Sequence, residues 1–118
     1  MQIIRQKSIN IERALGFIRE NLEKPLTLEE IAKESGMSKY HFSRVFKASA
    51  GRSFKKYLIE KRIDRAKNLL ANEDLNITEV CFSVGFNDLA YFDRIFKRRE
   101  GITPSAYRRQ LFNSVFLV

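Results

Sequence analysis

The amino-acid sequence repeats itself once, at a spacing of 49 to 50 residues. A shift of 49 aligns apolar and glycine positions of the two copies: Leu26, Ile31 and Gly36 with Leu75, Val80 and Gly85. One extra residue then enters, and a shift of 50 aligns aromatic, basic and glycine positions: Phe42, Arg44, Phe46, Lys47, Gly51 and Tyr57 with Phe92, Arg94, Phe96, Lys97, Gly101 and Tyr107. Two copies are too few for a solenoid, which needs at least three units to bury a continuous core. The repeat therefore favours duplication of one unit for binding at two points.

The net charge of +8 is concentrated in two blocks. Residues 39–67 carry ten basic side chains against two acidic ones, and residues 94–109 carry six against one. Each block follows one of the two aligned glycines, Gly36 and Gly85. Because Lys and Arg neutralise phosphates and release condensed counterions, the blocks favour a polyanion as partner. An acidic membrane surface is the alternative, but it would call for a basic amphipathic helix with exposed aromatics.

Cysteine usage and hydropathy limit the cellular setting. Cys81 is the only cysteine, so no intrachain disulfide can form and a reducing compartment is expected. The sequence contains no recognisable signal peptide and no apolar run near the ~18 residues that span a bilayer. We therefore expect a cytoplasmic protein with no membrane partner. Its 118 residues fit one domain, or two very small ones that share a core.

The apolar residues recur with the period of helices, and no stretch alternates apolar and polar residues as a strand would. We therefore predict an all-α protein of about seven helices. In each copy a short helix, a glycine turn and a second helix follow one another, which is typical of the helix-turn-helix, whose second helix enters the major groove of DNA. Capping residues place the helix starts at Ser8, Thr27, Ser38, Ser53, Asn76, Asn87 and Thr103.

The order of these elements predicts four segments. They are a first helix-turn-helix subdomain (1–52), a linker helix (53–72), a second helix-turn-helix subdomain (73–111) and an apolar tail (112–118). At about 1.5 Å per residue the linker helix spans roughly 27 Å. With its flanking turns it can separate two recognition helices by about the ~34 Å of one DNA turn. Both helices could then enter successive major grooves of one duplex.

The first recognition helix offers a row of hydrogen-bonding side chains at i, i+3, i+4 and i+7. Arg44 can donate two hydrogen bonds to guanine O6 and N7, and Tyr40 and Ser43 can contact neighbouring base edges. A solvated helix face is the alternative for such a row, but the repeat and the charge blocks favour DNA. The phosphate contacts of this copy are assigned to Ser38, Lys39 and Lys47.

The second recognition helix has a different outer row. Arg94 is its one clear base-reading donor, and Leu89 or Ala90 can contact thymine methyl groups. Asp93 either accepts a hydrogen bond from cytosine N4 or orients Arg94 through an ion pair; the ion pair is favoured, since an unpaired carboxylate near phosphates costs affinity. Since the two rows differ, one chain is expected to bind an asymmetric site as a monomer, with the first copy supplying most discrimination. The phosphate contacts of this copy are assigned to Asn87, Lys97 and Arg98.

The run from Gly85 to Lys97, followed by the run from Gly101 to Arg108, resembles the signature of the AraC/XylS family of bacterial transcription regulators. The resemblance covers about Ile9 to Arg109. It implies seven helices in two helix-turn-helix subdomains, a long linker helix, and usually gene activation through contact with RNA polymerase. Family members often carry a sensor or receiver domain before this unit; the 118 residues contain none, so a missing N-terminal domain of this kind is one expectation. The resemblance places the base-reading positions on Tyr40, Ser43, Arg44, Leu89, Ala90 and Arg94.

Other chemistry finds little support in the sequence. No Ser/His/Asp arrangement, glycine-rich phosphate loop or catalytic carboxylate pair stands out, so we expect neither an enzyme nor a cofactor. His41 has no cluster of further His or Cys with which to bind a metal, and Cys81 falls on the inner face of its helix, where a small hydrophobe is expected. The alternatives are a helical protein-interaction module and a nonspecific DNA binder. The salt dependence of binding distinguishes a protein-interaction module from a DNA-binding protein, because a protein that binds phosphates loses affinity steeply as the salt concentration rises.

Overall fold

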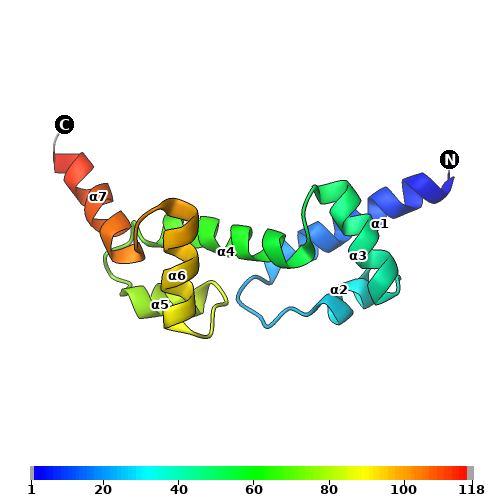
Figure 1. Ribbon diagram of the computed structural model, residues 1–118, viewed down its shortest axis with the longest axis horizontal. Helices are drawn as coiled ribbons and strands as arrows, with labels where there is room; N and C mark the ends of the chain where they lie inside the picture. The colour runs from blue at the N-terminus through cyan, green and yellow to red at the C-terminus, as the bar shows by residue number, and fades with distance from the viewer. Residues whose placement is uncertain (1, 117–118) are drawn as a thin grey trace. The chain divides into compact units, whose positions relative to one another are not determined.

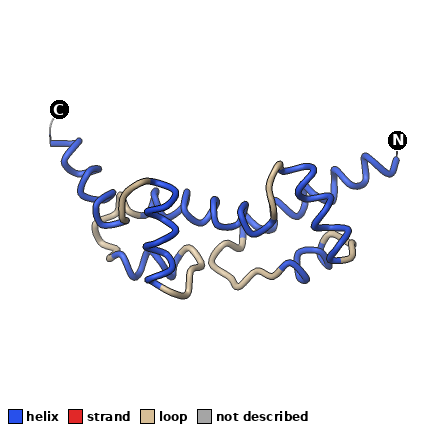
Figure 2. Tube along the Cα trace, viewed as in Figure 1, coloured by secondary structure: helices blue, strands red, loops and turns tan. Residues whose placement is uncertain are grey.

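The computed structural model describes residues 2–116, and the side chains of residues 11–113. This part of the chain forms seven α-helices and no strand (Figures 1 and 2). The predicted all-α class is therefore confirmed. None of the helices in the described part is long and apolar enough to cross a bilayer. The helices are α1 (Gln2–Glu20), α2 (Leu28–Glu34), α3 (Lys39–Ala50), α4 (Phe54–Leu69), α5 (Ile77–Ser83), α6 (Leu89–Glu100) and α7 (Pro104–Phe116).

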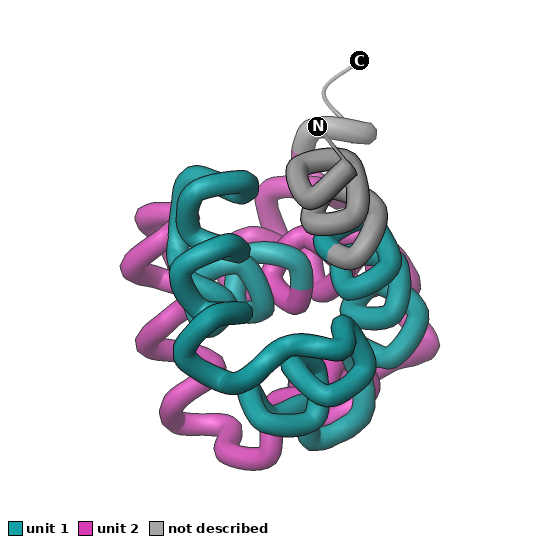
Figure 3. The backbone as a smooth tube through the Cα atoms, turned by 90° about the vertical axis from the view of Figure 1, so that its right-hand side faces the viewer, with its two compact units in different colours: residues 1–61 teal, residues 62–118 magenta. Residues whose placement is uncertain are grey.

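The chain divides into two compact units, residues 1–61 and residues 62–118, and the division falls within α4 (Figure 3). Unit 1 contains α1, α2, α3 and the first half of α4. Unit 2 contains the second half of α4, then α5, α6 and α7. Each unit therefore holds one helix-turn-helix, α2 and α3 in unit 1 and α5 and α6 in unit 2.

A stripe of apolar side chains on α1 begins the core of unit 1. Its members recur at three- and four-residue intervals, which places them on one face of the helix. Burial of each large aliphatic side chain contributes about 1.5–3 kcal/mol. The core includes Ile11, Ala14 and Ile18 of α1, Leu22 just after it, Ile31 and Ala32 of α2, Phe42 and Phe46 of α3, and Tyr57 and Leu58 of α4.

The repeat extends to the first helix of each unit. The buried positions of α4 in unit 2, together with Leu70 directly after the helix, follow those of α1 at a constant spacing of 52 residues. Ile63, Ala66 and Leu70 follow Ile11, Ala14 and Ile18. In unit 2, α4 therefore occupies the place that α1 has in unit 1. Each unit consists of a long helix, a helix-turn-helix and a helix that follows it, and α4 serves both units.

Most helices begin where the capping residues predict. The side chains of Thr27, Ser38 and Asn76 each accept a hydrogen bond from the backbone N–H three residues later. Asn76 also forms the complete capping box, because its own N–H donates to Glu79 Oε1 at 3.2 Å. These hydrogen bonds satisfy backbone N–H groups that have no partner within the helix.

The predicted cap of α6 is wrong by one residue. Asp88, not Asn87, accepts the hydrogen bond, from the N–H of Tyr91 to Oδ1 at 3.1 Å. The extra residue that changes the repeat spacing from 49 to 50 explains the difference. It lies in the turn before α6, so the residue equivalent to Ser38 is Asp88. A carboxylate at this position also interacts favourably with the helix dipole.

Two helices are longer than predicted. α1 begins at Gln2 rather than near Ser8, and α7 continues to Phe116 rather than ending after Tyr107. Neither extension contains a glycine or proline that would end a helix. Residues 112–116 of the expected apolar tail are therefore helical, and its last two residues lie outside the described part of the chain.

Candidate nucleic-acid interface

Each helix-turn-helix contains a turn in which a glycine has a positive φ. Gly36 and Gly85 have φ values of 68° and 104°, in a region that side chains rarely adopt. The same backbone hydrogen bond closes both turns: from Met37 N–H to Ala32 O at 3.0 Å, and from Phe86 N–H to Cys81 O at 3.1 Å. The turns fix the direction in which α3 and α6 leave the preceding helices.

The inner faces of α3 and α6 are anchored by equivalent aromatic side chains. Each helix buries two phenylalanines completely, and a tyrosine from the following helix packs edge-on against the second one. Such tilted and edge-to-face ring pairs are favourable beyond their burial. The ring centroids are 5.5 Å apart for Phe42 and Phe46, 5.8 Å for Phe92 and Phe96, 5.4 Å for Phe46 and Tyr57, and 5.5 Å for Phe96 and Tyr107.

The outer face of α3 carries the side chains predicted to read bases in the first copy. Tyr40 is 78% exposed, and Ser43, Arg44 and Lys47 are also exposed. Their spacing within the helix places them along one face. The structure therefore brings the predicted row of hydrogen-bonding groups together on the side opposite the buried phenylalanines.

The start of α3 is more constrained than the sequence predicts. Ser38 Oγ accepts the capping hydrogen bond from His41 N–H at 3.1 Å, which leaves its hydroxyl hydrogen able to donate. Lys39 Nζ lies 2.9 Å from Glu29 Oε1 on α2. The hydrogen bond between them raises the pKa of Lys39 and lowers that of Glu29. The periodicity of a single helix does not single out Glu29, because the contact crosses the turn between two helices.

The outer face of α6 offers fewer donors. Ala90, Arg94 and Lys97 are exposed, as is Arg98, whereas Leu89 is half-buried. The guanidinium carbon of Arg94 lies 6.0 Å from the centroid of the Tyr91 ring, at the limit of a cation–π contact. Asn87 is exposed and precedes the capping residue.

The predicted ion pair between Asp93 and Arg94 is wrong. Within residues 11–113 the structure forms no ion pair between these side chains, and Arg94 lies near Tyr91 instead. Adjacent helix residues point about 100° apart, so they do not face each other. Asp93 is half-buried, and burial raises the pKa of its carboxyl group.

Cys81 belongs to the core of unit 2. The side chain is fully buried, and this burial raises the pKa of the thiol to about 11. A thiolate, the reactive form, is therefore strongly disfavoured at neutral pH. In the described part of the chain, no group of three or more His, Cys, Asp and Glu side chains is arranged to hold a metal ion.

Comparison with known proteins identifies the family. A family model described as a helix-turn-helix domain matches residues 18–110. The fold matches the crystal structure of a transcriptional regulator of the AraC-type DNA-binding domain-containing proteins from Chromobacterium violaceum, with a TM-score of 0.80 and 29% identity over 87% of this chain and 92% of that one. The chain belongs to the AraC/XylS family.

Two further relatives show how this AraC/XylS chain compares with longer and with DNA-bound proteins. The MmsAB operon regulatory protein of Pseudomonas aeruginosa is 33% identical over 108 residues, which is 92% of this chain and 35% of that protein. The DNA-binding domain of the global transcriptional factor AdpA, solved in complex with a target DNA, has a TM-score of 0.81 and 28% identity over 85% of this chain and 90% of that one. The chain spans about a third of the length of the curated relatives it matches.

Proposed function

We propose that this chain is the DNA-reading part of a transcription regulator and inserts α3 and α6 into successive major grooves of one duplex. The observation that carries the proposal is the outer row of α3. A phenol, a hydroxyl and a guanidinium are exposed along one face, while the opposite face is anchored by two fully buried phenylalanines. A helix held in this way can present hydrogen-bond donors to base edges without losing its orientation.

In the first unit, Arg44 is the residue proposed to read a guanine through O6 and N7. Tyr40 and Ser43 contact the neighbouring base edges. Lys47 and Lys39 neutralise phosphates, and the hydroxyl of Ser38 donates to a phosphate oxygen while it caps α3. This division assigns base reading to Tyr40, Ser43 and Arg44, and phosphate binding to residues on either side of them along the chain.

In the second unit, Arg94 is the proposed base-reading donor, and Ala90 with the accessible part of Leu89 contacts thymine methyl groups. The phosphate contacts are proposed for Asn87, Lys97 and Arg98. Since this row offers less hydrogen bonding than that of α3, the two halves of the site differ. We propose that a single chain binds such an asymmetric site.

The proposal for the wider role rests on the family. We propose that the protein activates transcription by contacting RNA polymerase in the bacterial cytoplasm, and that it has no catalytic activity and needs no cofactor to bind DNA. The length of the relatives supports the further proposal that the unit works together with a sensor or receiver domain.

The test compares Arg44→Ala with Arg13→Ala, which removes the same charge from an exposed position on α1. Binding is measured on a duplex selected by the wild-type protein from a random library, and on a random duplex. Arg44→Ala is expected to cost about 1–3 kcal/mol on the selected duplex and to relax the preference at one base pair. Equal losses on both duplexes would refute base reading by Arg44.

A further inference from the structure

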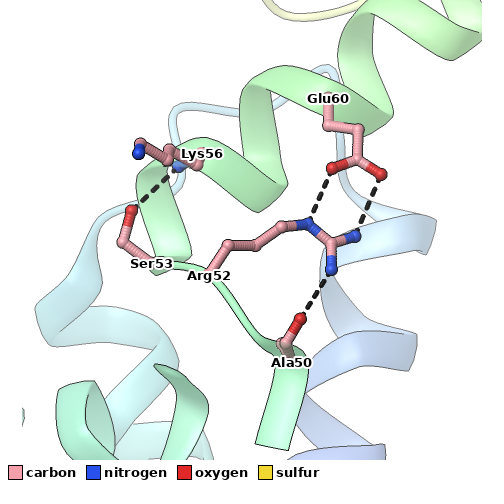
Figure 4. Close-up of polar contacts among 5 residues, drawn as sticks. All are labelled: Ala50, Arg52, Ser53, Lys56 and Glu60. Carbon is pink, nitrogen blue, oxygen red and sulfur yellow. Dashed lines mark hydrogen bonds and ion pairs between the residues drawn. The ribbon is translucent and has the colours of Figure 1, made fainter. Parts of the chain in front are cut away.

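The carboxyl-terminal end of α3 is tied to α4 by Arg52. Its Nε and Nη2 donate to the two carboxylate oxygens of Glu60 at 2.7 and 2.9 Å, and its Nη1 donates to the carbonyl oxygen of Ala50 at 2.6 Å (Figure 4). Ala50 is the last residue of α3, and Glu60 lies in the second turn of α4. The guanidinium group therefore joins the end of the recognition helix to the helix that follows.

An aromatic contact adds to this connection. The guanidinium carbon of Arg52 lies 5.0 Å from the centroid of the buried Tyr57 ring, which in turn packs edge-on against Phe46 of α3. The side chains of Arg52 and Glu60 are only 33% and 26% exposed, so water screens their bidentate pair less than an exposed one. We refer to Ala50, Arg52, Tyr57 and Glu60 as the Arg52 cluster.

In unit 2, different side chains bind the last residue of α6, which is equivalent to Ala50. Glu100, the last residue of α6, aligns with Ala50 of α3, and its Oε1 lies 2.9 Å from Lys67 Nζ on α4. The same Nζ lies 6.0 Å from the centroid of the Tyr107 ring. The hydrogen bond to Glu100 raises the pKa of Lys67. We refer to Lys67, Glu100 and Tyr107 as the Lys67 cluster.

The second copy lacks the two charged residues of the Arg52 cluster. The positions equivalent to Arg52 and Glu60 are Ile102 and Gln110, which cannot form an ion pair. Lys67 is at the position equivalent to Leu15 of α1, given the 52-residue spacing between buried residues of the two helices. Different charged residues therefore serve the two units. In each unit a cationic side chain lies near the equivalent tyrosine and binds the last residue of the recognition helix.

This convergence points to a shared requirement on the recognition helices. The buried phenylalanines hold the inner face of each helix in the core, and the charge-assisted hydrogen bonds add contacts with a preferred direction at its end. Arg44 and Lys47 lie within about two turns of the tied end of α3, so a shift at that end moves both side chains. Recognition of a base edge requires placement within about 0.5 Å.

We propose that Arg52 and Lys67 are positioning residues that set the orientation of α3 and α6, respectively, in the major groove. The inference rests on the proposed function of these helices in base reading. Because the two clusters share no residue, each can be broken without the other. Their effects on DNA recognition should therefore separate into two halves of the bound site.

The experiment selects duplexes from a random library with the wild type, Arg52→Met, Lys67→Met and the control Lys55→Met. Lys55 is exposed near the start of α4, and its substitution removes the same charge. Selections with Arg44→Ala and Arg94→Ala assign each half of the motif to its helix. Arg52→Met is expected to lower base discrimination about fivefold or more in the α3 half only, and Lys67→Met in the α6 half only. Affinity for random duplex should fall no further than in Lys55→Met.

A charge reversal separates positioning from loss of fold. The double variant Lys67→Glu with Glu100→Lys keeps the net charge and permits the ion pair. It should therefore restore the base discrimination in the α6 half that Lys67→Glu alone removes. Both variants are measured at a temperature well below their unfolding midpoints. Equal losses in both halves, or a reversed pair no better than the single variant, would overturn the inference. If Arg52→Met and Lys67→Met both select the same motif as the wild type, the positioning role is overturned while base reading by α3 and α6 still stands. If the wild type itself enriches no motif, base reading and the positioning role are both refuted.

Discussion

Glu29 is expected to weaken DNA binding if Lys39 contacts a phosphate as proposed, because the carboxylate then competes with the phosphate for the ammonium group of Lys39. The two side chains are exposed and joined by a 2.9 Å ion pair between α2 and the first turn of α3. If Lys39 contacts a phosphate, that ion pair must open and leave a carboxylate near the negatively charged backbone. Glu29→Gln should therefore tighten binding to every duplex, whatever its sequence.

The size of the effect follows from counterion release. When Lys39 of the wild type moves from Glu29 to a phosphate, the phosphate releases one counterion. The carboxylate of Glu29 loses its partner and takes up a cation, so the two effects cancel. In Glu29→Gln this cancellation is lost, so the slope of log affinity against log salt should steepen by about 0.9. The advantage of the variant over the wild type should then shrink about threefold for a threefold rise in salt.

The assay is an anisotropy titration of a labelled random duplex at several salt concentrations. Glu34→Gln is the matched control, because Glu34 is exposed at the end of the same helix and carries the same charge. Adding Lys39→Met to Glu29→Gln should abolish the gain in affinity. The reasoning is refuted if the Glu29 and Glu34 variants behave alike, or if the gain persists without Lys39.

Four further outcomes are expected. Lys97→Ala should weaken binding to all duplexes alike and make the salt slope about 0.9 shallower, and a loss confined to one sequence would contradict its phosphate role. Phe96→Ala should cost about 3–5 kcal/mol in urea denaturation, whereas Phe82→Ala, at a side chain that is 52% exposed, should cost less than about 1 kcal/mol; similar costs would contradict the assigned core. The pKa of Cys81 rises from 9.0 to about 11 on folding, so alkylation by iodoacetamide at pH 8 should be at least about 100-fold slower in the native than in the urea-unfolded protein. The same shift means that stability falls as pH rises from 9.0 toward 11, since the unfolded thiol ionises first, and a stability that rose over this range would contradict it.

Local sequence signals were sufficient to predict the number and order of the helices and the outer row of α3. Periodicity and capping depend on residues three or four positions apart, so a single sequence contains them. The start of α6 shows where this information becomes ambiguous. Asn87 and Asp88 are both good capping residues, and only the extra residue in the second copy of the repeat distinguishes them.

The missed features are contacts between helices. Glu29 and Lys39 meet across a turn, and Arg52 reaches Glu60 from within the turn before α4, so no helix periodicity reports that these side chains meet. The error at Asp93 has a different origin. Opposite charges at adjacent positions suggest a pair in the sequence, but helix geometry separates them. The two recognition helices were therefore predictable, while the ionic contacts at their ends depended on tertiary structure.

The most direct test of the account is selection of duplexes by the wild-type protein from a randomised library at near-physiological salt, followed by sequencing. We expect an asymmetric motif of two blocks about one helical turn apart, with stronger base preference in the block read by α3. A palindromic motif would contradict binding by a single chain, and the absence of any enriched motif would contradict sequence-specific reading by α3 and α6.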